Sequence, residues 1–282
     1  MAGGGFGTPE TPAPKKKKAA KKKAAVPSAL AIDRAKAAMT KQKAADPVLG
    51  EGSRRSQKRQ DARRVDVELG KGKAVAVMLP RLDGEVDDAD VAHMSMEAVA
   101  EKYGHLTGAG DIVWPAGLAF SRLLAHCPSF VEGKRVLELG TGIGAVGLVA
   151  ATSGAASVLL TDYDEAVLEF AREGATENGV SDSVTAARLD WSKSDLPEGA
   201  PFDVVLAADV LYAETNAMHI AKLLPELLSP SGRCFIADQA QWPWRADFQA
   251  ACAQGGLLVE DMKLPGPEDV RLLTVGRAAD LS

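Results

Sequence analysis

A glycine-rich segment is the part of this sequence best suited by its residue types to hold a ligand. Gly140, Gly142 and Gly144 follow a short apolar run, Arg135–Leu139, and precede a stretch with helical periodicity. Glycines at a strand-to-helix junction let the backbone turn sharply and approach a ligand with no Cβ atom between them. The pattern predicts a ligand site beyond the carboxyl end of a parallel strand.

Two carboxylates make the glycine loop a more specific signal. Asp162 ends the next predicted strand, 22 residues after Gly140, a spacing expected for a carboxylate that accepts hydrogen bonds from ribose hydroxyls. Glu138 would repel the pyrophosphate of a dinucleotide but attract the sulfonium and amino groups of S-adenosyl-L-methionine. The residues therefore favour S-adenosyl-L-methionine over a nicotinamide cofactor. The alternative interpretation of Asp162 is a cap for the following helix.

An acidic and aromatic pair, Asp190 and Trp191, follows the third predicted strand. A ring in this place can lie against the face of adenine, and a carboxylate can accept a hydrogen bond from the exocyclic amine. Ordinary core packing is the alternative for Trp191. The pair extends the predicted cofactor site toward the base.

Strand-like and helix-like patterns alternate from residue 111 onward, and these elements must position the residues above. The predicted helices are Leu118–Leu124, Ala145–Thr152, Asp164–Asn178, Glu214–Leu228 and Pro243–Gln254. The predicted strands are Arg135–Leu139, Ser157–Asp162, Val184–Leu189, Phe202–Asp209, Arg233–Asp238, Leu257–Lys263 and Val270–Gly276.

This alternation predicts an α/β fold, a Rossmann-like doubly wound sheet of seven strands with helices on both faces. Only a short Pro/Gly loop, LPGPED, separates the last two strands. No crossover helix fits there, so the C-terminal strand is expected to be antiparallel.

Several motifs together resemble the seven-β-strand (class I) protein methyltransferases, and in particular the lysine methyltransferases with a D-x-x-Y motif. The resemblance is carried by VLELGTGIGAVG, Asp162, the Asp190-Trp191 pair and Asp209-Val-Leu-Tyr212. VWPAG at Val113–Gly117 also matches the W-[DPS]-[AS] element of that group. The similarity covers about residues 105–265.

The resemblance implies a role for each matching residue. Gly140, Thr141 and Gly142 would hold the methionine part of the cofactor, and Asp162 the ribose. Trp114 and Trp191 would enclose the cofactor, with Ala208 contributing from the fourth strand. Asp209 and Tyr212 would face the substrate amine.

The chemistry of amine methylation supports the last of these roles. A lysine amine is charged at neutral pH, and it must lose a proton and align with the sulfonium carbon before transfer. A carboxylate at Asp209 would attract and orient the ammonium, and the Tyr212 ring would shape a narrow channel for it. The alternatives are a cap of the following helix for Asp209 and plain packing for Tyr212. The polar and aromatic loop Gln239–Trp244 either lines the substrate entrance or packs.

Charge divides the chain into an arm and a body. Residues 1–64 hold 17 lysines and arginines against 5 acidic residues, a net charge of +12, and residues 65–282 hold 16 against 33, a net charge of −17. We expect 1–64 to be a disordered Lys/Arg-rich arm, 65–110 an N-terminal extension with a β-hairpin, and 111–282 the S-adenosyl-L-methionine-binding domain. An acidic loop at Asp83–Asp90 and a short helix at Ala92–Lys102 are expected within the extension.

The arm and the body suggest different partners. The lysine runs are typical of an import-receptor signal or a nucleic-acid contact. The alternative is a tail that is solvated and binds no partner. A transit peptide fits less well because serines are few. The acidic body suits a basic protein substrate, and the resemblance implies a monomer.

The remaining composition excludes several classes of protein. No apolar run reaches about 18 residues, so no membrane span is expected. The three distant cysteines suggest a reducing compartment, which leaves the cytoplasm and the nucleus open, and no motif suggests a metal site. Two other functions stay open: methylation of another nucleophile (arginine, histidine or a small molecule) and a catalytically silent scaffold.

Overall fold

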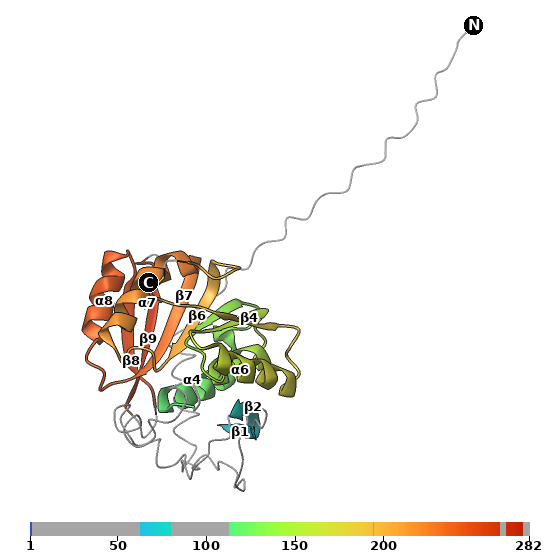
Figure 1. Ribbon diagram of the computed structural model, residues 1–282. Coiled ribbons are helices and arrows are strands. Elements are labelled where there is room, and N and C mark those ends of the chain that lie inside the picture. The colour runs from blue at the N-terminus through green and yellow to red at the C-terminus, as the bar shows by residue number, and fades with distance from the viewer. Residues whose placement is uncertain (2–62, 80–112, 194, 266–268, 279–282) are drawn as a thin grey trace.

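The computed structural model describes residue 1 and residues 63–79, 113–193, 195–265 and 269–278 of the 282-residue chain. Its main feature is one seven-stranded sheet with the order β5-β4-β3-β6-β7-β9-β8 (Figure 1). The strands are β3 (Arg135–Leu139), β4 (Ser157–Asp162), β5 (Val184–Arg188), β6 (Phe202–Ala208), β7 (Leu228–Gln239), β8 (Leu258–Lys263) and β9 (Val270–Gly276).

The first five of these strands are parallel, and β9 runs antiparallel to both of its neighbours. The predicted doubly wound sheet with an antiparallel C-terminal strand is therefore confirmed. Strand order reverses beside β3: β4 and β5 lie on one side of it, and β6 and β7 on the other. Ligands of such sheets bind beyond the carboxyl ends of the strands at this reversal.

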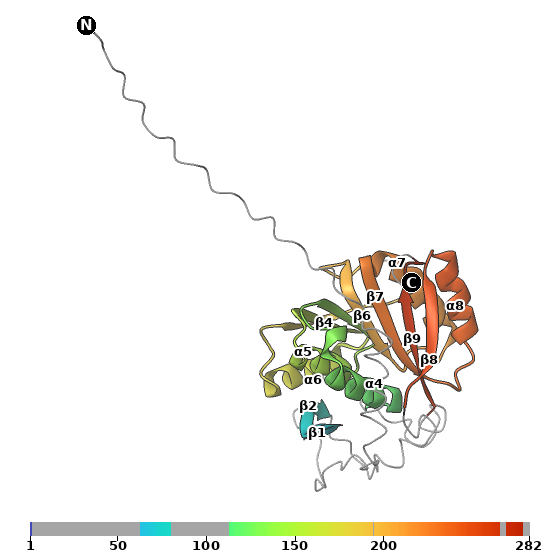
Figure 2. The same ribbon diagram turned by 180° about the vertical axis from the view of Figure 1, so that it is seen from behind.

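Two layers of helices cover the sheet, one on each face (Figures 1 and 2). Side chains of β3 point to opposite faces of the sheet: Val136 joins one apolar core, and Leu137 and Leu139 join the other. Both faces are therefore apolar, and each needs a layer of helices to cover it. The first core contains α4 (Pro115–His126), α5 (Ala145–Thr152) and α6 (Glu165–Glu177), and the second contains α7 (Glu214–Leu227) and α8 (Arg245–Gln254).

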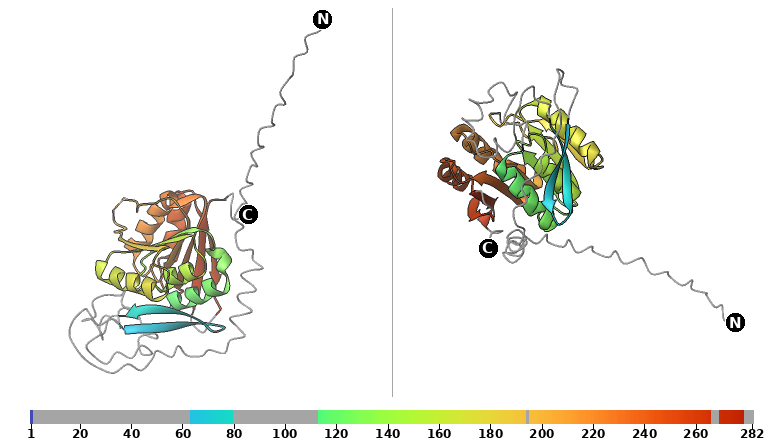
Figure 3. Two further views of the ribbon diagram at one scale, coloured as in Figure 1. Left: turned by 90° about the vertical axis from the view of Figure 1, so that its right-hand side faces the viewer. Right: turned by 90° about the horizontal axis from the view of Figure 1, so that it is seen from below.

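A separate β-hairpin, β1 (Arg63–Gly70) paired with β2 (Lys73–Leu79), lies on the outer side of the α4–α6 layer (Figure 3). The side chain of Asn178 holds it by pairing with one residue of β2. Its Oδ1 accepts from the Ala76 amide at 3.0 Å, and its Nδ2 donates to the Ala76 carbonyl at 2.7 Å. The expected hairpin is thus present, and it is anchored to the end of α6.

The predicted elements differ from the observed ones mainly at their ends. β7 begins at Leu228, directly after α7, because Leu228 already pairs with Phe202 of β6. The intervening Ser-Pro-Ser-Gly sequence reads as a turn and hides this early start. The acidic loop at 83–90, the helix at 92–102 and almost all of the arm lie outside the described residues, so the proposed division of the chain stays a prediction. Among the helices of the described ranges, none is long and apolar enough to span a membrane.

Candidate active site

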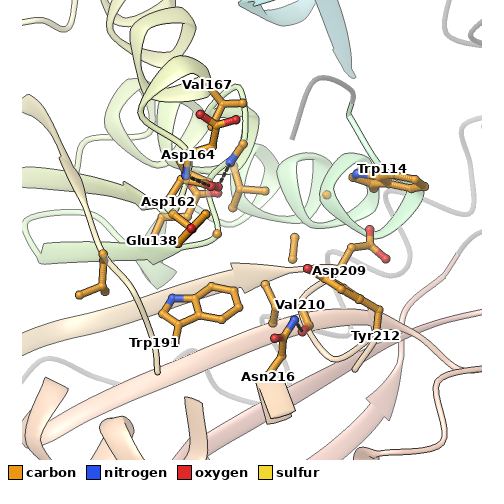
Figure 4. A pocket seen from close by; sticks show the side chains of 18 of the residues that line it. Trp114, Glu138, Asp162, Asp164, Val167, Trp191, Asp209, Val210, Tyr212 and Asn216 are labelled. Atoms are coloured by element: carbon orange, nitrogen blue, oxygen red, sulfur yellow. Dashed lines mark hydrogen bonds between the residues drawn. The ribbon is translucent and has the colours of Figure 1, made fainter. Parts of the chain in front are cut away.

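A pocket of about 600 Å³ opens at the carboxyl ends of the parallel strands, where the strand order reverses. Figure 4 shows Glu138 and Asp162 on one side of it, and Trp114, Asp209 and Tyr212 on the other. Eleven residues that the sequence or the resemblance indicated for the site line this one pocket: Trp114, Glu138, Gly140, Thr141, Gly142, Asp162, Asp190, Trp191, Ala208, Asp209 and Tyr212.

The glycine loop between β3 and α5 forms the floor of the pocket with its backbone. Gly140, Gly142 and Gly144 have φ angles of 66°, 52° and 90°, in the left-handed region that glycine adopts without strain. A Cβ atom on Gly140 would lie 3.1 Å from the Trp191 ring and from Val210. The loop therefore lets an aromatic ring approach the backbone closely.

Glu138 binds the loop from beneath. Its Oε2 accepts hydrogen bonds from the Thr141 hydroxyl and, at 3.0 Å, from the Gly147 amide in the first turn of α5. Only 2% of the residue is exposed, and this burial raises the pKa of Glu138 to about 8. A cation beside the carboxyl would favour its ionised form. Glu138 thus fixes the loop, and its attraction for a cationic cofactor stays a prediction.

Asp162, at the end of β4, connects two turns of the pocket wall. Its Oδ2 accepts from the Gly142 amide at 2.9 Å, and its Oδ1 accepts from the Asp164 amide at 3.0 Å. The cap of α6 is Asp164, whose Oδ1 accepts from the Ala166 amide at 2.8 Å. Asp162 therefore does not serve as that helix cap, and its carboxylate faces the pocket beside the glycine loop.

Asp190 and Trp191 lie on the neighbouring wall. Asp190 accepts hydrogen bonds from the Ser192 amide at 3.0 Å and the Ser192 hydroxyl at 2.6 Å, which lower the pKa of its carboxyl. Trp191 is half-buried and also packs against the second apolar core. Its Nε1 is buried, with no hydrogen-bond partner among the described residues. Packing and pocket lining are thus both features of this ring.

Asp209 has two structural connections that the sequence did not indicate. Its Oδ2 accepts from the Ala116 amide at 3.0 Å, so it caps α4, whose own N-cap residue, Trp114, provides no side-chain cap. Its Oδ1 accepts from Gln239 Nε2 at 3.1 Å. The expected alternative, a cap of the following helix, is therefore wrong: α7 has no side-chain cap, and the helix that Asp209 caps is α4.

The backbone and charge of Asp209 are both unusual. Its φ angle of 53° is rare for a residue with a side chain, and Asp and Asn tolerate it better than most. Burial raises the pKa of its carboxyl to about 6. Ala208 precedes it at the pocket wall, and Tyr212, three residues later, is 41% exposed at the same pocket.

The structure adds residues that sequence reasoning missed. The first turns of α7 place Thr215, Asn216 and His219 on the pocket wall, and helical spacing after Tyr212 would have indicated them. In the loop Gln239–Trp244, only Gln239 bonds to a pocket residue. Trp242 is buried and Trp244 packs against the second core, so packing is the observed role of both rings.

Acidic side chains predominate in the pocket lining. Five carboxyl groups face the pocket, and neither lysine nor arginine appears among the described residues that line it. The carboxyl groups would repel the pyrophosphate of a dinucleotide, whereas a sulfonium cofactor and an ammonium substrate are both cationic. No group of three His, Cys, Asp or Glu residues in the described ranges is arranged to hold a metal ion. The five carboxyls belong to Glu138, Asp162, Asp164, Asp190 and Asp209.

Comparison with known proteins identifies the family. Residues 95–249 match the family described as "Lysine methyltransferase", and the chain belongs to it. A protein N-lysine methyltransferase METTL21A from Xenopus tropicalis is 33% identical over 144 residues, which cover 50% of this chain and 66% of that protein. The protein-lysine N-methyltransferase EFM3 from Chaetomium thermophilum is 29% identical over 206 residues, covering 68% of this chain and 60% of that protein.

The matched relatives are longer than the regions they share with this chain. The chain spans between half and two thirds of the length of the first curated relatives it matches. Among solved structures, a TehB-like SAM-dependent methyltransferase from Corynebacterium glutamicum is 20% identical, with a TM-score of 0.47 over 64% of this chain and 97% of that one.

Proposed function

We propose that this protein is an S-adenosyl-L-methionine-dependent N-methyltransferase that transfers a methyl group to a lysine side chain of a protein. The observation that carries the proposal is the acidic pocket lining, with the carboxyls of Asp162, Asp164, Asp190 and Asp209 and no described lysine or arginine, because both reactants are cations. Membership of the lysine methyltransferase family supports the same activity.

The two ends of the pocket suit the two reactants. At one end, the Asp162 carboxylate would accept hydrogen bonds from the ribose hydroxyls, and the backbone of Gly140–Gly142 would lie along the methionine part of the cofactor. Asp190 and Trp191 would hold adenine. When bound, the cofactor supplies an electrophilic methyl group on a sulfonium.

Asp209 and Tyr212 would receive the amine at the other end. The carboxylate of Asp209 is held by two N–H donors, so it is fixed in direction, and its free lone pairs can accept from a substrate ammonium. The partly exposed ring of Tyr212 would contact the same cation through its face. The proton leaves to water, and Asp209 orients the amine without serving as the base.

Calorimetric titration with S-adenosyl-L-methionine tests the cofactor, with NADH as the control ligand. Micromolar binding of the first and none of the second supports the proposal, and the opposite result contradicts it. Transfer of a tritiated methyl group to lysate proteins, followed by mass spectrometry of the labelled peptides, then tests the acceptor. Label on lysine supports the proposal, whereas label on arginine, histidine or only small molecules redirects it.

The remaining assignments concern partners and place in the cell. We propose a monomer that works in the cytoplasm or nucleus, supported by the composition and the resemblance. For the lysine-rich arm, the charge of +12 supports contact with an import receptor or nucleic acid. Nuclear accumulation of a reporter fused to residues 1–64, compared with the same fusion after Lys15–Lys18 are changed to alanine, tests import. Salt-dependent binding of the same fragment to RNA tests the other contact.

A further inference from the structure

Beneath Asp209 lies a second acid, Asp238, that the proposed reaction does not use. Asp238 ends the apolar part of β7 and is fully buried, with 0% of its surface exposed. Its Oδ2 accepts from the Leu211 amide at 2.7 Å, and its Oδ1 accepts from the Gln239 amide at 2.9 Å. Burying a carboxyl group costs free energy, so the presence of Asp238 in the interior calls for a structural reason, which its two hydrogen bonds provide.

Three hydrogen bonds join the turn after β6 to the end of β7. Besides the bond from the Leu211 amide to Asp238, the Asp209 amide donates to the Ala237 carbonyl at 2.9 Å, and Gln239 Nε2 donates to Asp209 Oδ1 at 3.1 Å. The turn between Asp209 and Tyr212 is therefore held at its backbone and at its carboxylate by the same three residues of β7.

A third element fixes Gln239 in turn. Arg245, the first residue of α8, donates from Nη2 to the Gln239 carbonyl at 2.9 Å and from Nη1 to the Ala240 carbonyl at 3.3 Å. The amide that reaches Asp209 is thus attached to a braced backbone. Holding a side chain within a fraction of an ångström is what an in-line transfer requires.

We propose that Asp238 and Gln239 are positioning residues of the methyl-transfer site: they hold the left-handed turn at Asp209 so that its carboxylate faces the transferred methyl group. The proposal rests on the proposed function. Neither residue lines the pocket, so neither is expected to contact the cofactor or the substrate.

The test uses two cofactor analogues and needs no knowledge of the protein substrate. Sinefungin carries an ammonium group where the cofactor carries its methyl group, whereas S-adenosylhomocysteine has nothing there. A carboxylate facing that position favours sinefungin, so the ratio of the two dissociation constants reports where Asp209 points. Asp209→Asn should reduce the preference for sinefungin by roughly tenfold, because one charge-assisted hydrogen bond is lost.

We expect Asp238→Ala and Gln239→Leu to reduce the preference severalfold while the affinity for S-adenosylhomocysteine stays the same. Asp238→Asn, which keeps one acceptor oxygen, should fall between them and the natural chain. Asp203→Asn is the matched control. Asp203 also accepts a backbone amide, that of Arg135 at 3.1 Å, but at the other end of β6, so its variant should keep the full preference.

The outcomes separate the two levels of the proposal. If neither analogue binds the natural chain, the proposed function fails. If both bind equally, or if Asp238→Ala and Gln239→Leu keep the natural preference, the positioning role is refuted. Should Asp238→Ala fail to fold, Asp238→Asn and Gln239→Leu decide the question by the same ratio.

Discussion

Replacing Gly147 with alanine should destabilise the protein because the added methyl group has no room. Its Cβ would overlap Cδ2 of Leu160 and lie 2.5 Å from Oε2 of Glu138. Overpacking of this kind costs about 1–3 kcal/mol, and pushing the buried Glu138 carboxyl off its amide donor costs about 1–3 kcal/mol more. A gain of up to about 1 kcal/mol from the less flexible unfolded chain offsets part of this. The expected net loss is about 1–6 kcal/mol.

The assay is urea unfolding at neutral pH, with Gly117→Ala as the matched control. Gly117 is also in a helix, but its added Cβ would meet nothing closer than Cβ of Ala208, at 3.8 Å. That variant should therefore be up to about 1 kcal/mol more stable. Opposite signs for the two substitutions support the packing described here. A Gly147→Ala protein within about 1 kcal/mol of the natural chain would refute it.

Four further changes test the pocket and the arm. Asp162→Ala should weaken calorimetric binding of S-adenosyl-L-methionine by about tenfold or more through lost charge-assisted hydrogen bonds, and unchanged affinity would remove Asp162 from the site. Asp209→Asn should weaken that affinity less than Asp162→Ala does, because only a charge near the sulfonium is lost, while methyl transfer collapses, a result that surviving turnover would contradict. Because the pKa of Glu138 rises from 4.5 to about 8 on folding, its bound proton stabilises the unliganded protein below pH 4.5, and this stabilisation is lost as the pH rises through 8. Urea midpoints measured across this range should fall less steeply for Glu138→Gln than for the natural chain. Deletion of residues 1–60 should change neither the melting temperature nor the cofactor affinity, since none of the described pocket residues lies there.

The sequence predicts the sheet well because its signals are local. Apolar runs that end in glycine, such as Arg135–Leu139, coincide with strands buried on both faces, and the loop LPGPED is too short for a crossover. The start of β7 is not predicted. Pairing of Leu228 with Phe202 outweighs the local turn preference of Ser-Pro-Ser-Gly.

The pocket shows more clearly that contacts between distant residues are not predicted from the sequence. Residue types near the ends of predicted strands indicate Glu138, Asp162 and Trp191 as pocket residues, and the family resemblance adds others, such as Trp114 and Tyr212. The bonds of Asp209 to Ala116 and Gln239 join positions 93 and 30 residues away, and no periodic pattern reports such pairs. Asp238 looks like any acid at the end of a strand, and only the fold shows that it holds the Leu211 amide.

The left-handed backbone at Asp209 also bears on how members of this family diverge. Besides Asp itself, Asn and Gly are the residues that adopt a φ angle near 53° readily. A gene that drifts from Asp to Asn here would keep the turn and the oxygen that caps α4, yet lose the charge offered to an amine. A protein with this change would resemble an active enzyme in its overall sequence and in the shape of its site. The identity of this one residue therefore decides whether the same backbone turn can still offer a negative charge to an amine.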